Sequence, residues 1–209
     1  MAEELESRLR AGAEALGIAL TPAQAASLLL LVAELADWNR RFNLTGIRSP
    51  LEMVDKHLLD SLAVLPHLRG ARIADVGTGA GFPGLPLAIA DPARRFTLVE
   101  SIGKKVGFLR HAVGKLGLEN VEVVQGRAES FKPRSLFDGV IARALGSLAD
   151  FVRLAGHLAS RNGRLFAMKG RRPDAELENL PRGWRALALH RIRVPGLDAE
   201  RCLVELARV

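Results

Sequence analysis

A glycine-rich turn between two apolar runs constrains the fold of this chain more than any other feature. It lies in ADVGTGAGFPGLPLAI, residues 74–89, where a short strand-like run precedes it and a helix-like run follows. A turn of this kind presents backbone N–H groups at a helix N-terminus, where a ligand can bind. Two fingerprints fit the same glycines: G-x-G-x-x-G over residues 79–84, typical of dinucleotide sites, and G-x-G-x-G over residues 77–81.

Asp75, two residues before the first glycine, favours the second fingerprint. In a dinucleotide site its carboxylate would point negative charge at a pyrophosphate. S-adenosylmethionine instead carries a sulfonium and an ammonium group, which an acidic side chain attracts. We therefore expect Asp75 beside the cofactor's cationic end, with Gly77 and Gly79 allowing close backbone approach. Glu100 ends the next strand-like run, RFTLVE, and is expected to accept hydrogen bonds from both ribose hydroxyls.

The rest of the chain predicts an α/β fold. From residue 71 onward short apolar runs alternate with helical stretches, the pattern of a parallel sheet covered on both faces. The C-terminal residues read as two strands around a Pro-Gly loop, an antiparallel hairpin at the edge of the sheet. Residues 1–68 read as helices, with Thr21-Pro22 as an N-cap. We expect an N-terminal helical extension, residues 1–68, and a second domain, residues 69–209, in one compact globule.

Composition narrows the function classes. The chain has 209 residues and a formal net charge of +7, which favours an anionic partner such as nucleic acid. Its single cysteine, Cys202, excludes an intramolecular disulfide and a cysteine-rich zinc site, and no metal is expected. No apolar run approaches the length of a membrane span, and the acidic N-terminus is unlike a signal peptide. A cytoplasmic protein with no membrane partner is expected.

Several stretches, in order along nearly the whole chain, resemble one family. DVGTGAGFPGLPLAI, WNRRFNLT, HLLDS, FDGVIARAL and FAMKG are similar to recurrent stretches of the RsmG (GidB) family, which methylates guanine N7 in 16S rRNA. The resemblance implies a class I S-adenosylmethionine-dependent methyltransferase: a Rossmann-like, mostly parallel seven-stranded sheet with a C-terminal antiparallel hairpin. It also implies that Gly77 and Phe82 contact S-adenosylmethionine, that Ala128 and Glu129 hold the adenine, and that Arg143 lies near the methyl donor.

The implied target, position 527 of 16S rRNA, predicts a simple mechanism. Guanine N7 has a free lone pair and no proton, so no general base is needed. Catalysis then depends on aligning N7, the methyl carbon and the sulfonium, and Arg143 is expected to position the reactants. The implied partner is 16S rRNA, free or in an assembling small subunit, and a monomer would suffice.

Basic and polar residues outside the glycine turn are candidates for RNA contact. Lys169, Arg171 and Arg172 follow the fifth strand-like run, at the sheet edge where ligands of such folds bind. Asn43 and His57, in stretches that carry the resemblance, are candidates for lining the guanine pocket.

Trp38 and Phe42 lie four residues apart on one helical face and are expected in the core. Two alternatives to methyl transfer stay open at this stage: an NAD-dependent oxidoreductase that uses the G-x-G-x-x-G of residues 79–84, and a non-catalytic RNA-binding protein.

Overall fold

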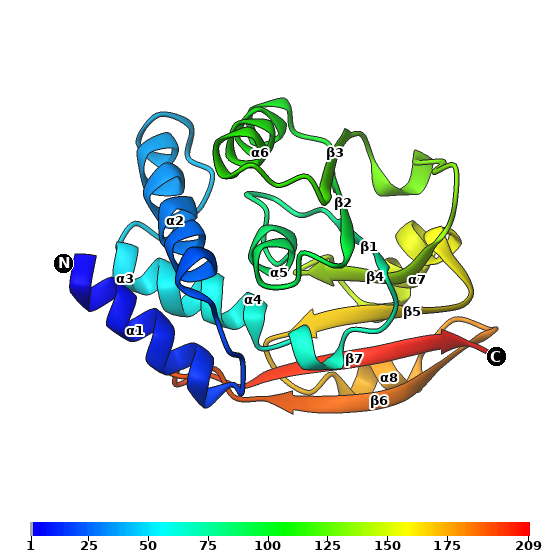
Figure 1. The fold of residues 1–209 in the computed structure, drawn as a ribbon. Helices are drawn as coiled ribbons and strands as arrows, with labels where there is room; N and C mark the ends of the chain where they lie inside the picture. The colour runs from blue at the N-terminus through cyan, green and yellow to red at the C-terminus, as the bar shows by residue number, and fades with distance from the viewer. Residues whose placement is uncertain (1) are drawn as a thin grey trace.

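The computed structural model describes residues 2–209, and its centre is one seven-stranded sheet with the strand order β3-β2-β1-β4-β5-β7-β6 (Figure 1). The strands are β1 (Arg72–Val76), β2 (Arg95–Glu100), β3 (Val121–Gln125), β4 (Phe137–Arg143), β5 (Ala159–Lys169), β6 (Trp184–Ile192) and β7 (Arg201–Arg208). Strands β1 to β5 are parallel, and β7 pairs antiparallel with both β5 and β6. The predicted α/β class, seven-stranded sheet and C-terminal hairpin are confirmed.

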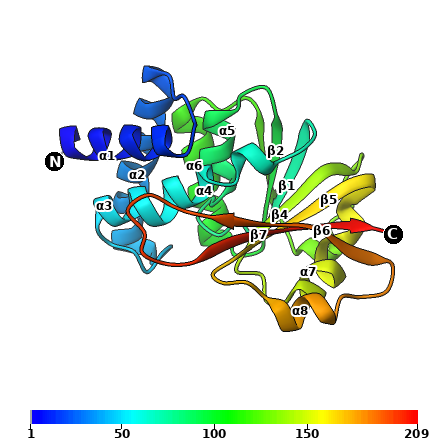
Figure 2. The same ribbon diagram turned by 90° about the horizontal axis from the view of Figure 1, so that it is seen from below.

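Helices cover both faces of this sheet (Figures 1 and 2). The N-terminal helices are α1 (Ala2–Ala15), α2 (Pro22–Phe42), α3 (Pro50–Met53) and α4 (Asp60–Leu62). The helices between or after strands are α5 (Gly84–Ala90), α6 (Gly103–Leu116), α7 (Leu148–Ala155) and α8 (Asp174–Glu178). Helices α5 and α6 share one face with the N-terminal helices, whereas α7 and α8 lie on the other.

Helix α2 begins where the sequence predicts. Thr21 Oγ1 accepts from Gln24 N at 3.2 Å, and Gln24 Oε1 accepts from Thr21 N at 2.9 Å. This reciprocal capping, with Pro22 in the first turn, satisfies backbone donors that a helix start leaves free. The helix ends at Asn43, whose φ of 48° is left-handed and turns the chain away.

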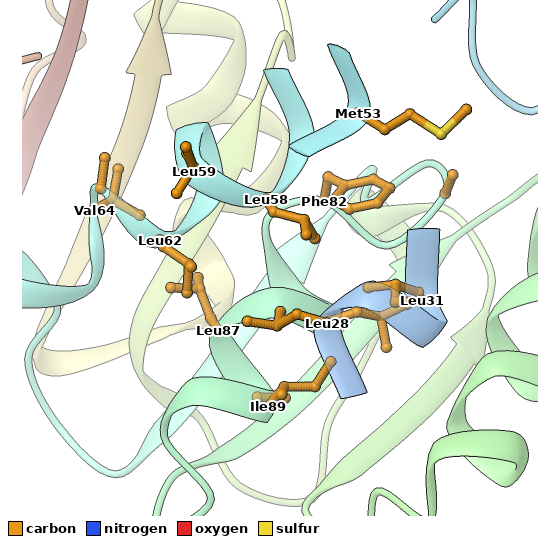
Figure 3. Packing of buried hydrophobic residues seen from close by; sticks show 14 of the residues in the cluster. Leu28, Leu31, Met53, Leu58, Leu59, Leu62, Val64, Phe82, Leu87 and Ile89 are labelled. Carbon is orange, nitrogen blue, oxygen red and sulfur yellow. The ribbon is translucent and has the colours of Figure 1, made fainter. Parts of the chain in front are cut away.

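One hydrophobic cluster joins the N-terminal helices to the sheet domain. Figure 3 shows Leu28 and Leu31 of α2 beside Leu87 of α5, with Leu58 and Leu62 above them. All five side chains are completely buried, so separating the two parts would expose a large apolar surface to water. The helical extension therefore shares one hydrophobic core with the sheet domain, and this core holds the two parts in place against each other.

Residues 50–62 of the extension form one helix interrupted by a wider turn, and we call this segment the helical wall. Residues 54–59 form a π-helical segment, Val54–Leu59, between α3 and α4. Such segments are rare and occur frequently at functional sites. Here the segment carries His57 and leads directly to Asp60.

No helix within residues 2–209 is both long and apolar enough to cross a membrane.

Candidate functional site

The glycine turn joins β1 to α5 at the carboxyl edge of the sheet. Gly77, Gly79 and Gly81 have φ values of 65°, 64° and 92°, a region where a side chain would be strained. The turn is held to the next strand, since Gly77 N donates to Val99 O at 2.9 Å. A Cβ on Gly79 would meet only Lys105 Nζ, at 3.9 Å, so the space above this residue is open.

Asp75 lies beneath this turn and does not reach its surface. Its side chain is fully buried, and Oδ2 accepts from Thr78 Oγ1 at 2.6 Å and from Gly84 N at 2.7 Å. Burial raises the pKa of Asp75 to about 6. The expected contact with a cofactor cation is therefore corrected: the β1 side chain points toward the start of α5, and its carboxylate braces the turn.

Glu100 lies at the end of β2, as expected, and also holds the turn. Its Oε2 accepts from Gly79 N at 2.9 Å, and its Oε1 accepts from Ile102 N at 2.9 Å. Each carboxylate oxygen keeps a second lone pair that can accept from a ribose hydroxyl. The open space above Gly79 and this carboxylate together fit the ribose and amino-acid tail of S-adenosylmethionine.

The predicted adenine residues follow β3 along the same edge. The register pairs Glu100 with Gln125, and a single turn of 3-10 helix, Ala128–Ser130, comes three residues later. Ala128 is half-buried against the core, whereas Glu129 is exposed. Their roles stay predictions, but their place beyond β3 agrees with them.

Phe82 and His57 join the turn to the N-terminal helices. The two rings stack with centroids 4.4 Å apart and planes 13° from parallel. Phe82 is only 3% exposed, so its side chain supports the turn from below, and the expected contact of this residue with the cofactor stays a prediction. Figure 3 shows its ring beneath the π-helical segment, near Leu58 and Met53.

Arg143, at the end of β4, is held by three groups of the helical wall. Its Nη1 donates to Lys56 O at 3.0 Å and to Asp60 Oδ2 at 3.1 Å, and its Nη2 lies 3.2 Å from His57 Nδ1. The following residue, Ala144, has a φ of 60°, so the chain turns sharply after the arginine. Arg143 is thus fixed between the cofactor turn and the helical wall.

The same network fixes the protonation of His57. An arginine only donates, so Nδ1 must accept and Nε2 carries the proton, which it donates to Thr45 Oγ1 at 2.9 Å. Burial, together with the charge of Arg143, lowers the pKa of His57 to about 3. His57 is therefore neutral near pH 7, and both ring nitrogens are engaged.

Asp60 receives a second arginine from the C-terminal hairpin. Arg201 Nε donates to Asp60 Oδ1 at 2.9 Å, while Arg143 occupies the other oxygen. The aspartate is 3% exposed, and the two guanidinium groups compensate its buried charge. Neither Asp60 nor His57 is free to take a proton from a substrate.

A cavity of about 610 Å³ opens beside this network. Its polar lining is Lys56, His57, Asp60, Arg143, Lys169 and Arg201, and its apolar lining includes Ile47, Val64, Met168, Ile192, Leu197 and Cys202. Mainly apolar walls with a few convergent polar groups suit a planar, partly polar ligand such as a nucleobase. The cavity lies on the β4 and β5 side of the glycine turn.

The structure separates the predicted RNA residues. Asn43 is exposed at the end of α2 and does not line the cavity. Lys169 lines it, but its Nζ donates to Gly146 O at 2.7 Å and to Glu176 Oε2 at 2.7 Å, so this lysine is not free for a phosphate. Arg172 pairs with exposed Asp174 at 2.5 Å, and Arg171 is exposed.

Three residues of the site were missed from the sequence. Thr45 and Asp60 lie within the WNRRFNLT and HLLDS stretches, and their place in these stretches is the signal that points to them. Arg201 gives no signal, because only the fold brings the hairpin to Asp60. Phe42 was expected in the core, yet it is 40% exposed.

The backbone donors of the turn argue against a dinucleotide. Gly79 N and Gly84 N, the first and last glycines of that fingerprint, already donate to Glu100 and Asp75. In a dinucleotide site such groups face the pyrophosphate, and here they face carboxylates. The oxidoreductase reading is therefore not favoured.

Comparison with solved structures places the fold. The chain is similar to the glycopeptide N-methyltransferase MtfA complexed with S-adenosyl-L-methionine, with a TM-score of 0.63 and 12% identity over 73% of this chain and 87% of that one. A SAM-dependent methyltransferase from Aquifex aeolicus matches with a TM-score of 0.55 and 21% identity over 71% and 90% of the two chains. The fold, with its glycine turn and β2 carboxylate, is that of a class I S-adenosylmethionine-dependent methyltransferase.

Comparison of sequences places the chain within that class. The family model GidB, rRNA small subunit methyltransferase G, matches residues 24–204. Ribosomal RNA small subunit methyltransferase G of Azoarcus sp. (strain BH72) is 49% identical over 202 residues, 96% of this chain and 95% of the relative. The Yersinia enterocolitica protein of the same name is 47% identical over 99% of this chain and 98% of its own. The chain belongs to the rRNA small subunit methyltransferase G family.

Proposed function

We propose that this protein transfers a methyl group from S-adenosylmethionine to N7 of one guanine in 16S rRNA. The observation that carries the proposal is the cavity beside the cofactor turn, whose two candidate bases, His57 and Asp60, are both fully engaged. A target atom that must lose a proton would need a free base there. Guanine N7 has a lone pair and no proton, so its methylation needs no base and fits a cavity in which His57 and Asp60 are both engaged.

The residues that would hold S-adenosylmethionine are those around the turn. Gly77 and Gly79 leave room for its amino-acid tail, Glu100 would accept from the ribose, and Ala128 and Glu129 would flank the adenine. When bound, the cofactor supplies a methyl carbon activated by a sulfonium. Phe82 would contact the cofactor from the same turn, which its stacking on His57 supports, and Asp75 lies beneath the turn and braces it.

The chain's contribution to the transfer is position and exclusion of water. With the cofactor bound, the N7 lone pair would accept its methyl group, the sulfonium would become a neutral thioether, and no proton would have to move. Arg143 is fixed by the helical wall at the point where the cavity meets the cofactor turn. From there it can position the guanine against the methyl donor, and the apolar lining can exclude water.

The sheet domain, residues 69–209, would hold the cofactor, and the helical extension, residues 1–68, would supply the target side of the cavity. We propose a monomer as the working unit. The names of the relatives support an RNA of the small ribosomal subunit as the partner, in the cytoplasm where that subunit assembles.

The test is methylation of 16S rRNA by the purified protein with labelled S-adenosylmethionine, offered on naked RNA and on partly assembled subunits. Digestion and mass analysis should place the label on one guanine, with N7 as the modified atom. Label on an exocyclic amine or on another RNA would contradict the proposal. RNA binding without transfer in any assembly state would instead favour a non-catalytic protein.

A further inference from the structure

An exposed aromatic side chain lies outside the cavity and plays no part in the mechanism above. Phe42, in the last turn of α2, is 40% exposed and packs on Trp38 with ring centroids 5.2 Å apart. Trp38 is itself held from behind by Phe108 at 5.7 Å and by His111 at 5.1 Å. Phe42 is therefore a ring with one face supported by a rigid aromatic group and the other side open to solvent.

The packing of α2 on α6 directs this ring toward the start of α6, the helix that follows Glu100. The two helices run antiparallel, because Glu34 Oε2 lies 2.6 Å from His111 Nε2, and four residues further along α2 the Trp38 ring lies 3.8 Å from a Cβ built on Gly107. Continued by four more residues, this antiparallel register directs Phe42 toward the first turn of α6, which carries Lys104. Figure 1 shows α2 and α6 adjacent at this end of the molecule.

This end of α6 is also exposed and partly apolar. Ile102, directly before the helix, is 44% exposed and follows Glu100 by two residues. Phe42 and Ile102 are two of the few large apolar side chains that the described chain leaves in solvent. From the antiparallel register of α2 and α6 we group them with their neighbours as the Phe42 surface, defined as Trp38, Arg41, Phe42, Ile102 and Lys104.

Two cations, Arg41 and Lys104, belong to this surface. Arg41 and Lys104 are exposed, and neither forms a hydrogen bond or ion pair through its side chain with another residue of the described range 2–209. Their neighbours differ, since Arg40 pairs with Asp37, and Lys105 lies 4.0 Å from Glu100. Unpaired positive charge beside a supported aromatic ring is the combination by which proteins hold single-stranded nucleic acid: the ring stacks on a base and the cations meet phosphates.

A chain of hydrogen bonds runs from the last turns of α2, next to this surface, to the cavity. Asn39, one turn before Phe42, accepts from Leu44 N at 2.7 Å and donates to Thr45 O at 3.0 Å. Thr45 in turn receives the hydrogen bond from His57 at the cavity wall. The loop that leaves α2 therefore leads directly from the Phe42 surface to the target side of the site.

We propose that Phe42, backed by Trp38 and flanked by Arg41 and Lys104, stacks on an unpaired base that neighbours the target nucleotide in the RNA. The inference rests on the proposed function for the identity of the partner, and it adds a specific contact that the cavity does not supply. The net charge of +7 agrees with a polyanionic occupant. A protein partner or the cofactor's adenine at this place are the outcomes that the test must separate.

The experiment compares Phe42→Leu, Phe42→Ala and Phe42→Trp in the full-length protein. Affinity for a single-stranded 16S rRNA fragment that contains the target loop is measured directly, and affinity for S-adenosylhomocysteine is measured by calorimetry. Loss of one stacked base predicts an RNA dissociation constant raised about fivefold to 150-fold in the Leu and Ala variants, with recovery in Phe42→Trp. The affinity for S-adenosylhomocysteine should not change.

Controls use residues of the same kind at the opposite edge of the sheet. Leu136, 46% exposed just before β4, gives the matched apolar variant Leu136→Ala, which should bind RNA as the unaltered protein does. Arg41→Gln should lower the slope of log affinity against log salt by about one, whereas Arg161→Gln near the start of β5 should leave it unchanged.

Three results would overturn the inference. These are unchanged RNA affinity in Phe42→Leu, equal losses in Phe42→Leu and Leu136→Ala, or a loss of S-adenosylhomocysteine affinity as large as that for RNA, which would assign the ring to the adenine. Because binding is measured without turnover, an RNA that binds through Phe42 but is never methylated would reject the proposed function alone. An RNA that is methylated normally by Phe42→Leu at limiting concentration would reject this inference alone.

Discussion

Asp60→Asn isolates the contribution of the buried carboxylate that joins three parts of the chain. In the folded protein Asp60 accepts from Arg143 at 3.1 Å and from Arg201 at 2.9 Å. Asparagine has nearly the same volume but keeps only one acceptor oxygen, and its amide nitrogen would face a guanidinium donor. One charge-assisted hydrogen bond is weakened and the other becomes a donor–donor contact.

The expected cost follows from the burial of the three side chains. Removing one partner of a fully buried pair costs about 3–5 kcal/mol, and an exposed pair contributes about 0–1 kcal/mol. The Asp60 side chain is 4% exposed, but those of Arg143 and Arg201 are 25% and 27% exposed, so water stabilises part of the released charge. We expect a loss of about 2–3 kcal/mol in the free energy of unfolding, or about 4–12 °C in Tm for a chain of this size.

Urea unfolding followed by tryptophan fluorescence measures this loss, with Asp174→Asn as the control. Asp174 pairs with Arg172 where both side chains are about two-thirds exposed, 64% and 65%, so its substitution should cost less than about 1 kcal/mol. Asp60→Asn should also lower methyl transfer, because Arg143 loses one of its anchors. Equal stability of the two variants would refute the view that Asp60 connects the helical wall, β4 and the hairpin.

Three other outcomes follow from the same geometry. Burial raises the pKa of Asp75 in the folded state to about 6, above the ordinary 3.8. As pH falls from 6 toward 4, the folded state therefore binds this proton before the unfolded state does. The free energy of unfolding should rise over this range, by at most about 1.4 kcal/mol per pH unit. His57 acts in the opposite direction, since its lowered pKa costs stability below pH 6.5, so the readout is the difference between the unaltered protein and Asp75→Asn in urea titrations at each pH. With no general base, log kcat should be flat across about pH 6 to 8, and a slope of one in single-turnover assays would contradict the mechanism. Arg143→Ala should lower kcat far more than Arg172→Ala, because only Arg143 meets the cofactor turn; equal losses would make Arg143 an ordinary phosphate contact.

The fold was predictable because its signals are local and repeated. Alternating apolar runs from residue 71 onward gave the parallel sheet, and the Pro-Gly loop predicted the hairpin that the structure confirms. The start of α2 at Thr21 was readable for the same reason, since a capping box involves neighbours in sequence. The π-helical segment was not predicted, and it determines where His57 points.

The site was only partly predictable, because proximity to a motif does not give the direction of a side chain. Asp75 lies next to the glycines, as predicted. A shift of one strand position decides whether a carboxylate projects beyond the end of the strand or lies beneath the glycine turn, and that of Asp75 lies beneath the turn. Lys169 was placed correctly at the sheet edge, yet Glu176 from the following helix neutralises it. Neither side-chain direction follows from the sequence, because each depends on how a loop folds back: the turn after β1 brings Thr78 and Gly84 to Asp75, and α8 brings Glu176 to Lys169.

The Phe82 and His57 stack changes what the helical extension contributes to the site. If residues 1–68 were only an appended RNA-binding unit, the cofactor turn would keep its shape without them. Phe82, however, is buried by His57 from the extension, and Arg143 is anchored by Lys56 O and Asp60 from the same segment. The extension therefore forms the floor of the cofactor turn and one wall of the cavity at once, so a substitution that loosens the π-helical segment should weaken cofactor binding and target positioning together.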